Sequence, residues 1–386
     1  MPSADTLEVL ARGSNAFGID LWPRAVKTTK GNFTMSPASI SIAFAMTYGG
    51  AKGETAAQMK KVLHFVDEPE AVMASWGGFS RKLSDPARPL TLRTANQLFG
   101  EKTYTFRQEY LDQVRAAFAA PLEELDFKSA PGPSRERINA WVEERTEKRI
   151  KDLLPVDSIK PLTRLVLVNA IYFLGNWERQ FDVAKTQDQP FATSASTNKQ
   201  VPMMQQVNHF GYAEAGGVKL LELPYKGGSA SLLVALPDEI DGLAAVEASL
   251  TTTKVDGWRQ ALQGQRVNVS LPRFEVSPGA SLPLKRELQA MGMPLAFDRD
   301  RADFSNMASP PNPDERLSID DAFHKAFVKV DEKGTEAAAA TGVVMTARGA
   351  ARPQKIVEFK ADHPFLFFVV EKASGLILFM GRVTEP

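Results

Sequence analysis

The chain has 386 residues, of which 44% are hydrophobic and 24% charged, and its 46 Lys and Arg balance 46 Asp and Glu. This composition is typical of a soluble globular protein with a sizeable core. A net charge of zero does not indicate binding to nucleic acid. The absence of cysteine excludes disulfides, thiol nucleophiles and thiolate metal sites.

The N-terminal part is predicted to be helical. Apolar residues at helical spacing predict a helix over residues 7–22, followed by a polar loop over residues 23–31. Ser36 as an N-cap, Pro37 in the first turn and a Gly-Gly stop at 49–50 predict a second helix, apolar on every side and therefore buried. The first twenty residues mix Asp5, Glu8, Arg12 and Asp20 with apolar positions, and no uncharged run among them resembles the apolar core of a secretory leader. No stretch reaches the roughly 20 apolar residues of a membrane span.

Strands are predicted mainly in the second half. Helices over 57–65 and 71–83 precede a strand over 90–99, and a capped amphipathic helix over 134–154 ends at Pro155. Residues 165–173 form an almost continuous β-prone run, typical of a central strand, with Asn169 in its middle. Further strands are predicted at 219–223, 231–236, 267–271, 358–370 and 376–383. Because strands and helices do not alternate regularly, the pattern predicts an α+β fold, which we expect to form a single domain over residues 1–386.

Residues 334–351 are small and almost uncharged, which is unusual for a core element. One interpretation is a surface linker or a short Ala-based helix. As a strand, however, the segment would present small or apolar residues at 335, 337, 339, 341, 343 and 345 on one face, with Glu336 on the other. A segment suited both to a loop and to the middle of a sheet is a candidate two-state switch.

The sequence around this segment carries a family resemblance. Residues 330–340, Val-Asp-Glu-Lys-Gly-Thr-Glu-Ala-Ala-Ala-Ala, resemble the hinge of inhibitory serpins nearly residue for residue. Other serpin-like motifs follow in family order: NFTMSP at 32–37, GAKGET at 50–55, NAIYF at 169–173, NW at 176–177, LELPY at 221–225, HPFLF at 363–367 and FMGR at 379–382. The resemblance implies a serpin fold with about nine helices, three β-sheets and an exposed reactive-centre loop at about residues 332–356.

The resemblance also implies the functional residues. The specificity residue of the family lies fourteen positions after the hinge glycine, which places the reactive bond at Arg348–Gly349 and implies a trypsin-like serine protease, trapped as a covalent acyl complex. Arg352 is a competing site, but Pro353 follows it and disfavours cleavage there. The implied hinge is Gly334, Thr335, Glu336, Ala337, Ala338, Ala339 and Ala340. The polar residues under the sheet, which we call the shutter, are Ser36, Ser39, Asn169 and His324, and the residues at the entry to the sheet, which we call the breach, are Trp177, Arg273 and Glu332. Within the breach, an ion pair is predicted between Glu332 and Arg273.

Two alternatives stand beside this interpretation. A non-inhibitory serpin would offer the loop only as a substrate, and a hydrolase is disfavoured because the sequence has no nucleophile elbow, zinc motif or phosphate loop. We expect a monomer that is not an enzyme and has no cofactor, metal, nucleic-acid or membrane partner. The resemblance favours an extracellular or periplasmic location, while the lack of a signal peptide in this chain is compatible with the cytoplasm. The lack of cysteine, of a leader and of a strongly basic helix favours a prokaryotic source.

Overall fold

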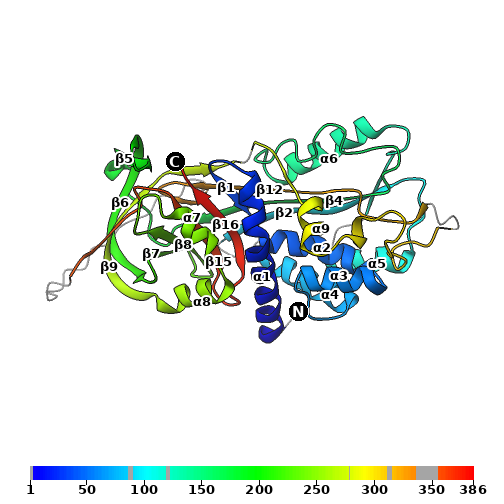
Figure 1. Cartoon of the computed structure of the whole chain (residues 1–386), viewed down its shortest axis with the longest axis horizontal. Helices are drawn as coiled ribbons and strands as arrows, with labels where there is room; N and C mark the ends of the chain where they lie inside the picture. The colour runs from blue at the N-terminus through cyan, green and yellow to red at the C-terminus, as the bar shows by residue number, and fades with distance from the viewer. Residues whose placement is uncertain (1–2, 86–89, 119–121, 278, 311–314, 336–354) are drawn as a thin grey trace.

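The computed structural model describes residues 3–85, 90–118, 122–277, 279–310, 315–335 and 355–386. These residues contain the following α-helices: α1 (Ala4–Thr28), α2 (Pro37–Gly50), α3 (Gly53–Val62), α4 (Pro69–Leu83), α5 (Gln108–Phe118), α6 (Pro131–Arg145), α7 (Leu243–Ala248), α8 (Thr252–Ala261) and α9 (Lys285–Met291). The helices pack against two β-sheets, and β5 (Gln187–Ser194), β6 (Thr197–Glu214) and β9 (Gln263–Pro272) form an edge of the molecule that no helix covers in Figure 1. The α+β fold predicted from the sequence is therefore confirmed.

Helices α1 and α2 show how local signals and packing share the control of helix ends. The Ser36 hydroxyl accepts a hydrogen bond from the Ser39 amide at 3.1 Å, and all fourteen residues of α2 are buried, as predicted. Helix α1, in contrast, continues through Pro23 to Thr28, so the predicted loop at 23–31 is wrong over most of its length. Trp22 and Ala25 are fully buried on either side of the proline, and their packing outweighs the missing proline amide.

A seven-stranded sheet runs along the long axis of the molecule (Figure 1). Its strands lie in the order β10 (Phe274–Val276), β12 (Ala322–Val330), β13 (Gly334–Thr335), β4 (Leu165–Asn176), β2 (Leu90–Glu101) and β3 (Glu123–Leu125), and β11 (Leu282–Pro283) pairs with β12. The predicted central strand is β4, which is buried over nearly its whole length. It pairs antiparallel with β2 on one side and parallel with β12 on the other.

The second sheet has nine strands. Their order is β1 (Phe33–Met35), β16 (Ile377–Val383), β15 (Phe365–Glu371), β8 (Ala230–Pro237), β7 (Val218–Pro224), β6 (Thr197–Glu214), β9 (Gln263–Pro272) and β14 (Val357–Lys360), with β5 (Gln187–Ser194) also paired to β6. Three sheets were expected, whereas the described strands form two hydrogen-bonded sheets. The reason is β6, whose eighteen residues pair with β5, β9 and β7 in turn and so join two sets of strands into one sheet.

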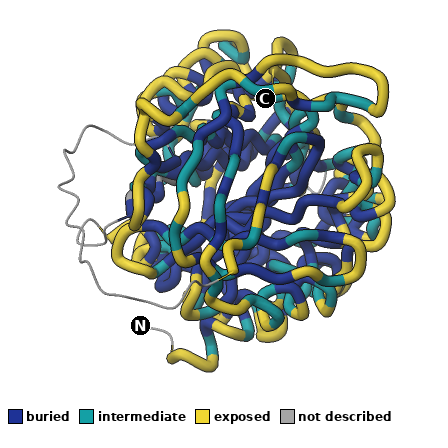
Figure 2. Tube along the Cα trace, turned by 90° about the vertical axis from the view of Figure 1, so that its left-hand side faces the viewer, coloured by how far each residue is buried: buried dark blue, intermediate teal, exposed yellow. Residues whose placement is uncertain are grey.

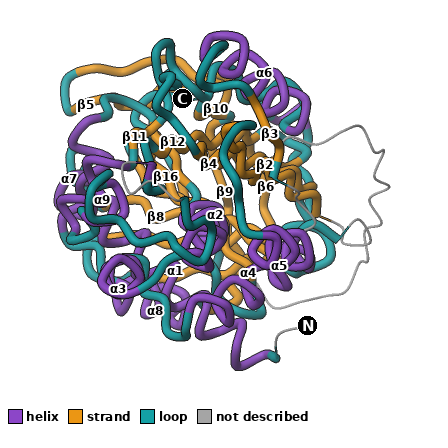
Figure 3. The backbone as a smooth tube through the Cα atoms, turned by 90° about the vertical axis from the view of Figure 1, so that its right-hand side faces the viewer, coloured by secondary structure: helices purple, strands orange, loops and turns teal. Residues whose placement is uncertain are grey.

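Buried residues fill the interior of the molecule (Figure 2). Alternate residues of β4 belong to two separate buried clusters, so apolar residues are buried on both faces of the seven-stranded sheet. Helix α2 lies in the middle of the molecule, against one face of the seven-stranded sheet, and α6 lies at the periphery, against the other face of that sheet (Figure 3). Helix α6 packs Trp141 edge-on against Phe99 of β2, with 5.5 Å between the ring centroids. The sequence predicted this helix to lie on a flat surface, but also to continue to residue 154.

Helix α6 ends at Arg145, nine residues earlier than predicted. Glu147 and Lys148 have positive φ angles of 50° and 63°, so the chain reverses there. The Asn139 side chain then forms two hydrogen bonds with the backbone of Leu154, at 2.8 and 3.0 Å. The returning segment thereby buries its own apolar residues against the sheet, which a longer helix could not do.

Candidate functional site

The boundary between β12 and β4, which we call the seam, has two parts that differ in strand pairing. From Ala322 to Phe327, β12 pairs directly with β4 over six residue pairs, from Leu167 to Tyr172. Beyond this stretch, β13 lies between the two strands, with Thr335 opposite Val330 of β12 and Gly175 of β4. The first two hinge residues named from the sequence therefore already occupy the entry end of the seam.

Thr335 is fixed at this entry by a buried hydrogen bond. Its side chain is fully buried, and its hydroxyl lies 2.6 Å from the hydroxyl of Tyr225. The Tyr225 ring stacks on Trp177 with 4.7 Å between the centroids, and burial raises the pKa of Tyr225 far above its ordinary value. The phenol is therefore neutral and can either donate to or accept from Thr335.

Gly334 fits the seam because it has no side chain. A Cβ atom at this position would overlap the carbonyl oxygen of Gly175 and crowd the Cα of Asn176. Both are backbone atoms of β4 and cannot turn aside as a side chain could. Glycine is thus required here by the close approach of two backbones.

The predicted ion pair between Glu332 and Arg273 is present. Arg273 Nε donates to both carboxylate oxygens of Glu332, at 2.7 and 2.9 Å, and the Thr186 hydroxyl also donates to that carboxylate. The Glu332 side chain is only 5% exposed, whereas Arg273 is 41% exposed. Burial alone would raise the pKa of Glu332, but the hydrogen bonds from Arg273 and Thr186 outweigh it and hold the pKa below its ordinary value.

Trp177 forms hydrogen bonds with the segment that immediately precedes Gly334. Its indole Nε1 donates to the carbonyl of Asp331 at 2.9 Å, and its backbone amide donates to the carbonyl of Lys333 at 2.8 Å. The three breach residues predicted from the sequence, Trp177, Arg273 and Glu332, therefore all hold the segment that leads into Gly334.

The four predicted shutter residues lie together beneath the closed part of the seam. His324 of β12 and Asn169 of β4 are register partners, and His324 Nδ1 lies 2.6 Å from Asn169 Oδ1. The Ser36 amide donates to His324 Nε2 at 3.0 Å, so Nε2 is unprotonated and Nδ1 carries the proton of the neutral ring. Burial lowers the pKa of His324 to about 3, which favours this neutral form.

Asn169 extends the same network to α2 and β2. Its amide nitrogen lies 2.6 Å from the Ser39 hydroxyl and 2.8 Å from the Ser39 carbonyl. It also donates to Oδ1 of Asn96 at 2.7 Å. One side chain thus joins two strands and a helix under the seam, so the network is disturbed wherever these strands move apart.

Sequence reasoning missed three residues of these networks, Asn96, Thr186 and Tyr225. Tyr225 ends the LELPY motif, and Asn96 is a polar residue inside a predicted strand, which are the signals that could have identified them. Thr186 follows a short 3-10 helix and carries no pattern that marks it. The remaining predicted hinge residues, Glu336 and Ala337 to Ala340, lie outside the described residues, as do Arg348, Gly349 and Arg352.

Two searches of the described residues gave negative findings. No three His, Asp or Glu side chains in these ranges come together in a way that could hold a metal ion. None of the helices placed by the structure combines the length and apolar character that crossing a bilayer requires.

Comparisons with known proteins agree with this geometry. A family model described as "Serpin (serine protease inhibitor)" matches residues 12–386. The chain is 40% identical to human Serpin B3, with 98% of this chain and 99% of that protein covered, and 39% identical to the leukocyte elastase inhibitor of Equus caballus, with 98% and 100% covered. It is also similar to the crystal structure of uncleaved ovalbumin, with a TM-score of 0.88, 32% identity, and coverage of 98% of this chain and 100% of that one.

These two sequence relatives are mammalian and do not support the prokaryotic source expected from the sequence. The names of these relatives do not state a cellular location, so they do not support the expected extracellular or periplasmic location either. The match over nearly the whole chain does decide the family. This protein belongs to the serpin family of serine protease inhibitors.

Proposed function

We propose that the protein inhibits a trypsin-like serine protease by acting as a suicide substrate cleaved at Arg348–Gly349. The observation that carries this proposal is the state of the seam. Gly334 and Thr335 already lie between β12 and β4, while the rest of these two strands pair directly with each other. The two strands are therefore already parted at one end of the seam, where a strand that continues from Thr335 would enter.

The chemistry begins in the target. The protease serine attacks the carbonyl carbon of Arg348, the protease histidine takes the serine proton, and that proton passes to the leaving amine of Gly349. The product is an acyl-enzyme that joins Arg348 to the protease. A guanidinium at this position suits a protease whose specificity pocket ends in a carboxylate, because the two form a charge-assisted hydrogen-bonded pair.

Insertion must then occur before water releases the protease. If residues 336–347 extend the strand begun by β13 at about 3.3 Å each, the acylated end moves about 40 Å and carries the protease with it. The small side chains at 337–340 favour this step, since a charged or bulky residue would be buried without a partner.

The seam determines the barrier to insertion. Six residue pairs between β12 and β4 must separate, together with the His324–Asn169 hydrogen bond across them. A new strand would restore ladder hydrogen bonds on both of its sides, so the inserted state has one ladder more than the starting state. The intact protein would consequently be metastable and held by a kinetic barrier.

Incubation with trypsin tests the proposal directly. We expect a complex that survives SDS and a released C-terminal fragment whose first residue is Gly349. Arg348→Ala should abolish complex formation with trypsin, whereas the matched variant Arg352→Ala should retain it. Cleavage at Gly349 with full turnover of trypsin and no complex would instead support the non-inhibitory alternative, in which the loop is only a substrate.

Thr335→Arg tests insertion separately from cleavage. Thr335 is fully buried, and its one side-chain partner among the described residues is the neutral Tyr225 hydroxyl, so a guanidinium there would be buried without a compensating charge and the first hinge residues should leave the seam. Trypsin should then cleave the variant without being trapped, which raises the number of inhibitor molecules consumed per enzyme. Thr335→Ser keeps the hydroxyl and should inhibit as the native protein does; unchanged inhibition by Thr335→Arg would contradict the insertion model.

A further inference from the structure

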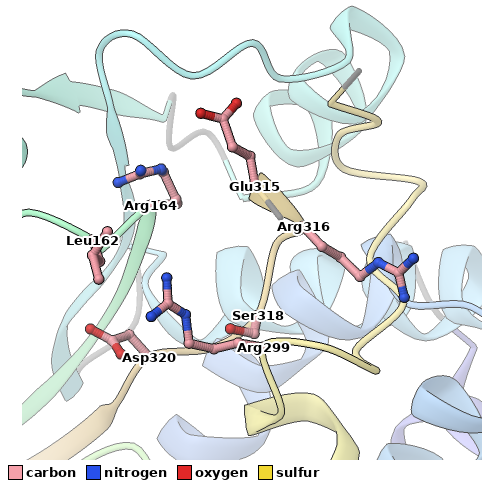
Figure 4. A pocket seen from close by; sticks show the side chains of 7 residues that line it. All are labelled: Leu162, Arg164, Arg299, Glu315, Arg316, Ser318 and Asp320. Carbon is pink, nitrogen blue, oxygen red and sulfur yellow. The ribbon is translucent and has the colours of Figure 1, made fainter. Parts of the chain in front are cut away.

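A polar recess lies at the end of the seven-stranded sheet opposite the hinge (Figure 4). It is lined by Leu162, Arg164, Arg299, Glu315, Arg316, Ser318 and Asp320. Arg164 immediately precedes β4, and Asp320 lies two residues before β12. The recess therefore spans the two segments that lead into the strands of the seam.

Two arginine side chains line this recess from different segments of the chain. The guanidinium of Arg164 is held in place by the carbonyls of Pro161 and Thr163, at 3.0 and 3.1 Å. Figure 4 shows the Arg299 side chain extended toward Arg164, while Arg316 points away and donates to the carbonyl of Asp300 at 3.0 Å. Among the described residues, Arg299 has no hydrogen-bond or ion-pair partner.

The carboxylates near the recess do not neutralise this pair. Asp320 accepts a hydrogen bond from the Thr163 hydroxyl at 2.7 Å, and Figure 4 shows Glu315 directed away from Arg299. Within the described part of the chain, neither carboxylate forms an ion pair with Arg164 or Arg299. Among the described side chains directed into the recess, Arg164 and Arg299 face the single carboxylate of Asp320, so one positive charge is in excess.

We propose that the recess binds a small tetrahedral oxyanion, represented by inorganic phosphate, between Arg164 and Arg299. Planar guanidinium groups bind such oxygens through paired hydrogen bonds, and one of the two groups is already held in position. The recess contains about 340 Å³ including its open mouth, but only about 20 Å³ in its interior. That interior has room for about one water, so the anion binds at the mouth, and the Ser318 hydroxyl lines the same space.

Arg299 lies in the turn after the 3-10 helix Leu295–Phe297, and this region is hydrogen-bonded to the segment that enters β12, from Arg316 to the Asp300 carbonyl and from the Ile319 amide to the Ala296 carbonyl. An anion between Arg164 and Arg299 would therefore join the segment that enters β4 to this turn and, through it, to the segment that enters β12. The Thr163–Asp320 hydrogen bond already links the two entering segments directly, and Lys285 donates to the carbonyl of Asp320 at 2.6 Å. A phosphate between Arg164 and Arg299 adds a second bridge at the same end of the seam. Bound anion thereby favours direct pairing of β12 with β4, and a ligand that binds this state preferentially stabilises it.

Isothermal titration with sodium phosphate, at constant ionic strength set with chloride, tests the site. We expect one phosphate per chain, and Arg299→Gln should weaken its affinity by about tenfold or more, as for loss of a charge-assisted contact. Arg299 is exposed and makes no contact with a described partner, so this variant should fold normally. Arg286→Gln is the matched control, because Arg286 is also exposed, has no partner among the described residues, and lies outside the recess.

Hydrogen exchange measures the predicted effect on the seam. Phosphate should slow amide exchange at residues 322–327 and 167–172 in the native protein and in Arg286→Gln, but not in Arg299→Gln. Absence of phosphate binding by the native protein, or equal binding by Arg299→Gln, would overturn the site. Binding that leaves exchange at these residues unchanged would overturn the bridge between the two strands. None of these measurements depends on protease inhibition.

Discussion

Replacing Tyr225 by Phe removes the phenolic hydroxyl that lies 2.6 Å from the Thr335 hydroxyl. Thr335 is fully buried, so its hydroxyl would be left without a partner in the seam. An unsatisfied buried hydroxyl costs about 1–3 kcal/mol. The reverse change, Thr335→Val, preserves the shape of the side chain and strands the Tyr225 hydroxyl instead. The double variant removes both groups and should recover most of the lost free energy.

The amide of Asp331 reports whether the hinge occupies the seam. It donates to the carbonyl of Gly334 at 2.9 Å, and this bond breaks when Gly334 and Thr335 leave. Local opening that costs 1–3 kcal/mol less should speed exchange of this amide by about 5- to 150-fold in each single variant. The double variant should exchange within about threefold of the native protein.

A distant buried phenol provides the control. Tyr110 is also fully buried and donates to the carbonyl of Met46 at 3.0 Å, so Tyr110→Phe should lower overall stability without speeding exchange at Asp331. If the two single effects at Tyr225 and Thr335 simply add in the double variant, the hydroxyls do not interact. That result would refute the argument that this hydrogen bond holds the hinge in the sheet.

The remaining predictions concern the residues around the seam. Burial lowers the pKa of His324 to about 3, whereas the pKa of the unfolded residue is near 6.5. Neutral His324 therefore costs no stability above pH 6.5, but the free energy of unfolding falls by about 1.4 kcal/mol per pH unit as the pH drops from 6.5 toward 3. His324→Gln should remove this part of the pH dependence of stability, and an unchanged slope would contradict the assignment. Glu332→Gln should speed exchange of the Asp331 amide about tenfold, because Arg273 loses its buried carboxylate partner. The control is Glu275→Gln, which removes an exposed ion pair with Lys329 at 3.7 Å and should change this exchange less than twofold. Equal effects of the two variants would argue against a special role for Glu332. Gly334→Ala should displace the hinge, at a cost of about 1–3 kcal/mol, because the new methyl overlaps the Gly175 carbonyl; native exchange at Asp331 in this variant would show that the backbones are not so close.

Local sequence signals identified those parts of the fold whose conformation depends on short-range chemistry. The Ser36 cap, the stop at Gly49-Gly50 and the apolar run of β4 all produced the predicted elements, because caps and continuous burial leave a direct pattern in the chain. The long β6 was not predicted, since its exposed and buried residues do not alternate regularly while it changes partners. Strand β12 was also missed, because Lys325 interrupts its apolar pattern; this lysine is buried, and its amine donates to the carbonyl of Lys151.

The candidate site divides along the same line. The sequence by itself predicted the hinge, the breach and the shutter residues through its resemblance to one family over the whole chain, and the breach and shutter residues lie in contact in the folded chain. Only the tertiary structure decided that Thr335 already lies in the seam, that Tyr225 binds it, and that Asn96 completes the network under the sheet. The Asn96–Asn169 and Tyr225–Thr335 hydrogen bonds join residues 73 and 110 positions apart, so no local pattern encodes them. They arise only when the packed strands bring the two partners to the same place.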